Sequence, residues 1–208
     1  ANGNMVSMTE NGNTTTYEYN YENRLTKVTS PDGIWEYSYD AVGNRNAVTH
    51  DGIEARYAID PMGLGDIAAE YSVDGTLIAK YVHGLGLLAK TKGDDTFYYH
   101  FSPIGHTSEI TGDEGNVVNR YQYTPFGNLK QRIESISNPF TYVGEYGVMD
   151  DENGLYNMRM RFYSANQGRF MSTDSYYNPR YNCYSYANNN PIKYSDPTGL
   201  WFILITGG

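Results

Sequence analysis

Residues 37–63 read YSYDAVGNRNAVTHDGIEARYAIDPMG and contain two copies of a short tyrosine phrase, separated by an Asp-Gly pair. Each phrase begins at a tyrosine, Tyr37 or Tyr57, and reaches a glycine six residues later. Residues 34–39, which lead into the first phrase, alternate in the two-residue period of a half-buried strand. Because an Asx-Gly pair between such runs is a strong hairpin signal, this stretch predicts antiparallel strands joined by tight turns. The turn expected for such a pair is type I′, which needs positive φ at both residues.

The same phrase recurs along residues 1–130. Its six copies are spaced by 20, 20, 24, 18 and 22 residues, and they begin at Tyr17, Tyr37, Tyr57, Tyr81, Tyr99 and Tyr121. Between them lies a second series of turn signals, at Asn11-Gly12, Asp32-Gly33, Asp51-Gly52, Asp74-Gly75, Lys92-Gly93-Asp94 and Asp113-Glu114-Gly115-Asn116. A generic β-meander with tyrosines in cross-strand pairs is the simpler interpretation. Two interleaved series with one period favour a true repeat of two strands and two turns, roughly a dozen strands in all.

Composition supports a mostly β protein and excludes several function classes. The 208 residues include 22 tyrosines and 22 glycines, with only 19% charged residues, which suits strands and turns better than helical bundles. The net charge of -9 and the lack of Lys/Arg clusters argue against a nucleic-acid partner. Cys183 is the only cysteine, so we expect no internal disulfide, and no metal or cofactor site is predicted. No apolar run is long enough for a membrane-spanning helix.

The phrases YSYDAVGNR and YEYNYENRL resemble the YD repeats of Rhs proteins, insecticidal toxin-complex C subunits and the teneurin shell. This resemblance implies antiparallel hairpin repeats that form a curved, spiralling sheet, the wall of a hollow shell. Six repeats are enough for a curved sheet with a core, but too few to enclose a folded cargo. The chain begins without an initiator Met or a signal segment, so we expect it to be an internal piece of a longer polypeptide.

A second resemblance covers the C-terminal third. The segments GLYNMRMRFY, GRFMSTD and YSYANNNPIKYSDPTGL follow one another in the order of the Rhs-associated core domain, the C-terminal module of the family. The predicted organisation is a YD-repeat sheet over residues 1–136, a core domain capping it over residues 137–200, and an apolar tail over residues 201–208.

In toxin-bearing members this module is an aspartyl autoprotease that cuts just after its DPxGL motif and frees a C-terminal effector. The resemblance assigns the arginine of the site to Arg161 and the two aspartates to Asp174 and Asp196. The bond to be cut is Leu200-Trp201. The implied partners are the rest of a longer YD-repeat polypeptide and its effector, and the implied location is secreted or at a bacterial cell surface, with any signal outside this piece.

The residues support this chemistry on their own terms. Two carboxylates that share a site do not both ionise readily, so one serves as acid while the other activates a water. An adjacent arginine would orient one of them through paired hydrogen bonds. Structural roles are the alternative. Asp196-Pro197-Thr198-Gly199 has the residues of a type I turn, including Pro197 and Gly199, Arg161 and Arg159 fit one face of a solvated strand, and Asp174 fits a turn cap.

Two departures from the family pattern flank Asp174, at residues 164–168 and 174–177, where the usual proline-containing motifs are missing. A rival function therefore stays open. In it the chain is a non-catalytic structural or cell-surface module that self-assembles into a homo-oligomer or filament. The apolar segment from Trp201 to Ile205 would then add to the sheet of a neighbouring copy.

Overall fold

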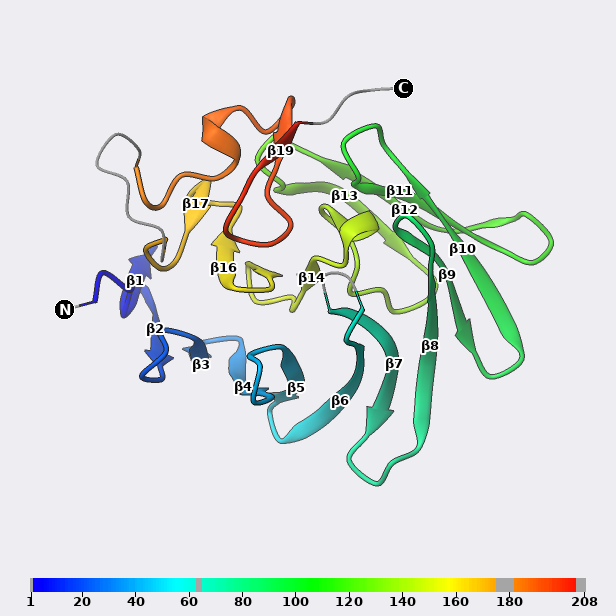
Figure 1. Cartoon of the computed structure of the whole chain (residues 1–208), viewed down its shortest axis with the longest axis horizontal. Helices are drawn as coiled ribbons and strands as arrows, with labels where there is room; N and C mark the ends of the chain where they lie inside the picture. Colours follow the sequence, from blue (N-terminus) through cyan, green and yellow to red (C-terminus); the bar gives the residue numbers. More distant parts are fainter. Residues whose placement is uncertain (1, 63–64, 175–181, 205–208) are drawn as a thin grey trace.

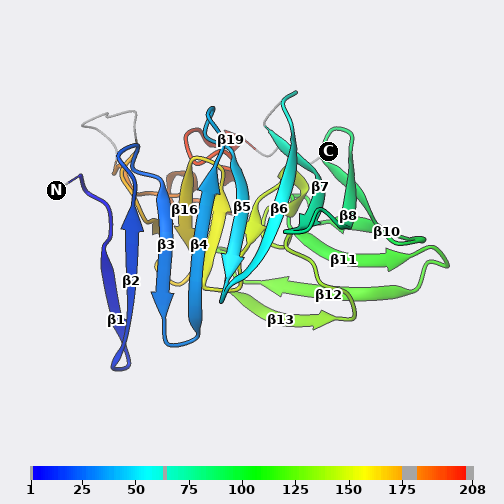
Figure 2. The same cartoon turned by 90° about the horizontal axis from the view of Figure 1, so that it is seen from below.

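The computed structural model describes residues 2–62, 65–174 and 182–204. Its main feature is a 13-stranded antiparallel sheet whose strands follow one another in chain order (Figures 1 and 2). The strands are β1 (Ser7–Glu10), β2 (Asn13–Tyr19), β3 (Leu25–Ser30), β4 (Gly33–Tyr39), β5 (Arg45–His50), β6 (Ile53–Asp60), β7 (Asp66–Ser72), β8 (Leu77–His83), β9 (Leu87–Lys92), β10 (Asp95–Phe101), β11 (Thr107–Gly112), β12 (Val117–Tyr123) and β13 (Leu129–Glu134). The sheet bends into an open arc, which confirms the predicted curved, mostly β fold.

The remainder of the chain fills the hollow of this arc, where Figure 1 shows it in yellow, orange and red. It contains a small four-stranded sheet, a two-stranded sheet and two 3-10 turns. These elements are η1 (Gly144–Tyr146), β14 (Met149–Asp150), β15 (Leu155–Met158), β16 (Arg161–Ser164), β17 (Arg169–Phe170), η2 (Ala187–Asn189), β18 (Tyr194–Ser195) and β19 (Ile203–Leu204). In the described part of the chain, no helix is long and apolar enough to cross a membrane.

The tyrosines that open the repeated phrases all point into the hollow of the arc. Five of them are buried, Tyr17 and Tyr37 in one core cluster and Tyr81, Tyr99 and Tyr121 in another. Tyr57 is partly buried and packs against the second cluster. Alternation along each strand places every second side chain on this face. Each phrase therefore contributes one large aromatic ring to the core, and the polar neighbours face solvent.

In four of the six copies a glycine lies six residues after the tyrosine, whereas the first copy has Asn23 and the fourth has Leu87 there. Of these glycines Gly63 lies outside the described residues, and the other three have a backbone role. Gly43, Gly105 and Gly127 have φ of 93°, 79° and 93°, and Asn23, which replaces glycine in the first copy, has φ of 62°. In the second copy the Gly43 amide donates to the Asp40 carbonyl at 3.1 Å, closing the turn. Left-handed backbone is accessible to glycine and, at modest cost, to asparagine. This explains why glycine or asparagine occupies the position in these copies.

The hairpins between the phrases use two kinds of turn. Asn11-Gly12 and Asp51-Gly52 have positive φ at both residues, as the type I′ turn predicted for Asx-Gly pairs requires. The same prediction is wrong at Asp32-Gly33 and at Asp74-Gly75, where within each pair only the glycine has positive φ. In the second pair the Asp74 carboxylate accepts the Thr76 amide at 3.0 Å. This local hydrogen bond holds the aspartate in an ordinary conformation.

The first strands and the C-terminal elements share one core. Tyr17, Trp35 and Tyr37 from the arc pack with Leu155 and Phe162 from β15 and β16. A buried ion pair adds to this contact, since Arg45 at the start of β5 meets Asp151 with side chains 2% and 5% exposed. The strands β15 and β16, which carry part of the candidate site, therefore pack against the first strands of the arc.

Candidate functional site

Arg161 is the centre of the candidate site. It opens β16, directly after the tight turn that joins β15 to β16, and its side chain is 5% exposed. Its guanidinium carbon lies 3.7 Å from the centroid of the Phe170 ring, a cation-π geometry. Packing against this ring fixes the plane of the guanidinium and directs its five donors toward the segments that follow.

The structure brings both predicted aspartates to this guanidinium. Arg161 Nη2 lies 2.9 Å from Asp174 Oδ2 and 3.7 Å from Asp196 Oδ2. The Nη1 group donates to the Cys183 carbonyl at 2.9 Å, and Nε donates to the Gly199 carbonyl. One side chain therefore holds together three segments that are distant in sequence, as the paired hydrogen bonds of an arginine allow.

Asp196 begins the turn that precedes the Leu200-Trp201 bond. Its Oδ1 accepts the Leu200 amide at 3.1 Å and the Thr198 hydroxyl at 3.1 Å. Burial raises the pKa of the Asp196 carboxyl, although Arg161 and the Thr198 hydrogen bond act in the opposite direction. Asp196 therefore holds a proton more tightly than an exposed aspartate does, whereas the Asp174 carboxylate forms the closer ion pair with Arg161.

Gly199 is required by the shape of this turn. Its φ is 70°, and a Cβ placed there would lie 2.7 Å from the Met158 carbonyl oxygen. The neighbouring Pro197 carbonyl accepts Arg159 Nη1 at 3.0 Å. The turn is thus fixed against the β15–β16 connection from two directions.

A cavity of about 320 Å³ opens beside these groups. Its lining includes Arg161, Asp174, Asp196 and both residues of the predicted cleavage bond, Leu200 and Trp201. The cavity has room for water at the peptide that would be hydrolysed. All seven residues predicted for the site and its turn therefore lie in one small region of the fold.

The apolar tail turns back on the same region. Within the described residues, Ile203 and Leu204 form β19 and pair with β18, with Tyr194 opposite Leu204. The rings of Tyr194 and Phe202 lie 5.0 Å apart in an edge-to-face arrangement. Ile205, the last residue of the predicted strand-adding segment, lies outside the described residues.

Comparison with known proteins extends these observations. The RHS Repeat family model matches residues 1–34. Across 98% of the chain the sequence is 31% identical to the tRNA3(Ser)-specific nuclease WapA of Bacillus spizizenii, and across 95% it is 26% identical to the Double-stranded DNA deaminase toxin A of Burkholderia cenocepacia. A crystal structure of TcdB2-TccC3-Cdc42 superposes on 89% of the chain with a TM-score of 0.68 and 18% identity, a likeness of fold. The chain belongs to the Rhs/YD-repeat family.

This Rhs/YD-repeat chain matches only a small share of the length of each of these proteins. It spans 9% of the WapA nuclease, 16% of the deaminase toxin and 10% of the superposed toxin-complex chain. What the chain shares with these proteins is the RHS repeat and the curved β-sheet of the toxin shell. Both findings confirm the family and the fold predicted from the tyrosine phrases. The described residues contain no group of three His, Cys, Asp or Glu side chains placed to hold a metal ion.

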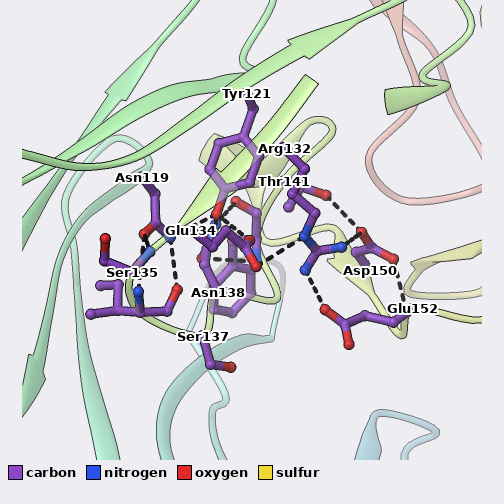
Figure 3. Close-up of polar contacts among 12 residues, drawn as sticks. Asn119, Tyr121, Arg132, Glu134, Ser135, Ser137, Asn138, Thr141, Asp150 and Glu152 are labelled. Carbon is purple, nitrogen blue, oxygen red and sulfur yellow. Dashed lines mark hydrogen bonds and ion pairs between the residues drawn. The ribbon is translucent and has the colours of Figure 1, made fainter. Parts of the chain in front are cut away.

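Sequence reasoning missed a second polar cluster, which lies where the arc of the Rhs/YD-repeat sheet ends (Figure 3). Arg132 on β13 pairs with Glu134 at 2.9 Å and with Asp150 at 3.4 Å, and it also contacts Glu152. Thr141 donates to the Asp150 carboxylate at 3.3 Å. Burial raises the pKa of Asp150 to about 6, against the effect of Arg132.

A ring of amides and hydroxyls continues this cluster along the connection after β13. Asn119 accepts the Ser135 amide at 2.9 Å and donates to the Tyr121 hydroxyl at 2.8 Å. Asn138 accepts the Tyr99 hydroxyl at 2.9 Å. Asn119 thus satisfies backbone amides of the connecting segment, and the Ser135 amide also donates to the Val118 carbonyl of β12 at 3.0 Å. The available signal was the SNPF sequence of residues 137–140, in a segment that breaks the repeat period and resembles the linker into the core domain. It does not predict these contacts.

Proposed function

We propose that this chain is the closing part of an Rhs β-shell and that its C-terminal module hydrolyses the Leu200-Trp201 bond, releasing the polypeptide that follows. The observation that supports this most strongly is the position of Arg161 between Asp174 and Asp196 beside that bond. The proposed division at residue 136 follows the end of the last arc strand at Glu134. A secreted or bacterial cell-surface location and a C-terminal effector partner belong to the same proposal.

The reaction is a single hydrolysis within one chain. Asp174, ion-paired with Arg161, takes a proton from water as the water oxygen bonds to the carbonyl carbon of Leu200. The carbon-nitrogen bond then breaks, and Asp196 supplies the proton that the Trp201 nitrogen needs as it leaves. The products are a Leu200 carboxylate and a Trp201 amine. Because the peptide is part of the enzyme, its effective concentration is high and a modest catalyst is sufficient.

Intact-mass spectrometry of the 208-residue chain tests this proposal. Wild-type protein made by in vitro synthesis should lose the mass of residues 201–208 with time, and Asp174→Asn and Asp196→Asn should keep it. Asp113→Asn is the matched control, because that exposed carboxylate lies in a turn where it accepts the Thr96 amide. A wild-type chain that keeps its full mass indefinitely would show that the module does not cut itself.

A second candidate rests on the exposure of the tail. Trp201, Phe202, Ile203 and Leu204 are 41–61% exposed although all are apolar, and exposed apolar strands promote association. In this alternative the chain is a non-catalytic module that assembles into a larger β-structure or filament. Size-exclusion chromatography with electron microscopy separates the two candidates, since a strictly monomeric particle before and after removal of residues 201–208 contradicts assembly.

A further inference from the structure

The Thr198 hydroxyl stands between the acid of the proposed reaction and the nitrogen that must leave. It donates to Asp196 Oδ1 at 3.1 Å. The same oxygen accepts the Leu200 amide at 3.2 Å and the Trp201 amide at 3.3 Å. The Trp201 nitrogen is the leaving atom of the Leu200-Trp201 bond, so the hydroxyl links a reacting atom to a buried carboxyl.

The backbone around Thr198 is fixed, so this link is not the result of a loose side chain. The Thr198 carbonyl accepts the Met160 amide at 3.2 Å. The Arg161 guanidinium holds the next carbonyl, that of Gly199. Since threonine has one rotatable bond to its hydroxyl and a branched Cβ, a fixed backbone leaves the oxygen few positions.

The far side of the bond is held as well. The pairing of β19 with β18 and the ring contact between Phe202 and Tyr194 anchor the chain two residues after Trp201. The peptide is thus restrained on both sides. Movement of the Trp201 nitrogen away from the hydroxyl is limited before the bond is cut.

We propose that Thr198 carries the proton of Asp196 to the Trp201 nitrogen, a role that rests on the proposed hydrolysis. Before reaction the Trp201 N-H donates to the hydroxyl. Once water has added to the Leu200 carbon, the nitrogen becomes pyramidal and gains a lone pair. The hydroxyl hydrogen turns from Asp196 toward that lone pair and is given to it, while the protonated Asp196 gives its own proton to the Thr198 oxygen. One proton leaves Asp196, one reaches Trp201, the hydroxyl is restored and the carbon-nitrogen bond breaks.

The proton transfer requires a hydroxyl at position 198. Position 198 is the unspecified residue of the DPxGL pattern, so the motif alone does not demand a hydroxyl there. Valine has the shape of threonine without the hydroxyl, and serine keeps the hydroxyl with a smaller side chain. These two substitutions separate proton transfer from packing.

The experiment measures the first-order rate of mass loss in the 208-residue chain. Thr198→Val should slow cleavage about 100-fold or more, the usual contribution of a general acid, and Thr198→Ser should stay within about tenfold of wild type. The declining limb of the pH-rate profile should move to higher pH in Thr198→Val, because the lost hydrogen bond no longer lowers the pKa of Asp196. Thr124→Val is the matched control, since that hydroxyl accepts the Asn128 amide in another turn.

The outcomes are distinguishable. If wild type is cut and Thr198→Val is cut equally fast, the relay is wrong and the proposed hydrolysis stands. If Thr198→Ser is as slow as Thr198→Val while both keep the wild-type melting temperature, the hydroxyl is not the active feature and the relay is again wrong. If wild type is never cut, the proposed function fails and the relay fails with it.

Discussion

Replacing Arg45 by methionine should destabilise the whole molecule, because it leaves the Asp151 carboxylate buried without its partner. Both side chains are almost fully enclosed, at 2% and 5% exposure. Arg45 also donates to the Met149 sulfur at 2.9 Å, and its guanidinium lies 5.3 Å from the centre of the Tyr37 ring. Breaking a buried ion pair from one side costs about 3–5 kcal/mol, so we expect the free energy of unfolding to fall by that amount.

Urea-induced unfolding followed by tryptophan fluorescence measures this change, with the buried Trp35 as reporter. The double variant with Arg45→Met and Asp151→Asn should recover most of the loss, because no unpaired charge remains. Arg56→Met is the matched control, since its partner Glu54 is 30% exposed and such surface pairs contribute about 1 kcal/mol at most. If Arg45→Met costs no more than Arg56→Met, the pair does not fasten the C-terminal elements to the arc.

Three further predictions concern the two polar clusters. Asp150 has a pKa of about 6 when folded against 3.8 otherwise. Its contribution to stability is therefore complete only well below pH 3.8 and is lost as the pH rises through 6, so the free energy of unfolding of wild type should gain about 2 kcal/mol over that of Asp150→Asn between pH 7 and pH 4; an equal change of the urea midpoint with pH in the two proteins would refute this. Gly199→Ala should slow self-cleavage at least about tenfold, because φ of 70° and the Met158 carbonyl oppose a Cβ; an unchanged mass-loss rate contradicts this. Arg161→Lys should abolish most cleavage although the charge is kept, because a lysine lacks the fork of donors; wild-type kinetics would show that charge alone suffices.

The regular part of the fold was predictable because its signals are local. The tyrosine at the start of each phrase and the glycine that follows it six residues later in four of the six copies are read from one strand and one turn. The left-handed conformation of Asn23 follows the same logic as Gly43. Asp74 shows the limit of this local reading, because its side chain accepts the amide of Thr76 and the same Asp-Gly pair then forms a different turn.

The candidate site was predictable as a set of residues but not as a set of contacts. Motif order placed Arg161, Asp174 and Asp196 in one module, and the structure gathers them at one guanidinium nitrogen. The alternative of a solvated strand face for Arg161 is wrong, because the side chain is 5% exposed. The pair between Arg45 and Asp151 had no local signal at all, since its partners are 106 residues apart.

The strand order of the arc also has a consequence for how the chain assembles. Each strand from β1 to β13 pairs only with its sequence neighbours, so the sheet can grow hairpin by hairpin as the polypeptide emerges, without waiting for distant partners. The elements around Arg161 come last and pack on the strands that came first, through contacts such as Phe162 with Tyr37. Any chemistry at Leu200 would therefore act as a completion signal, beginning only once the first and last parts of the chain have met.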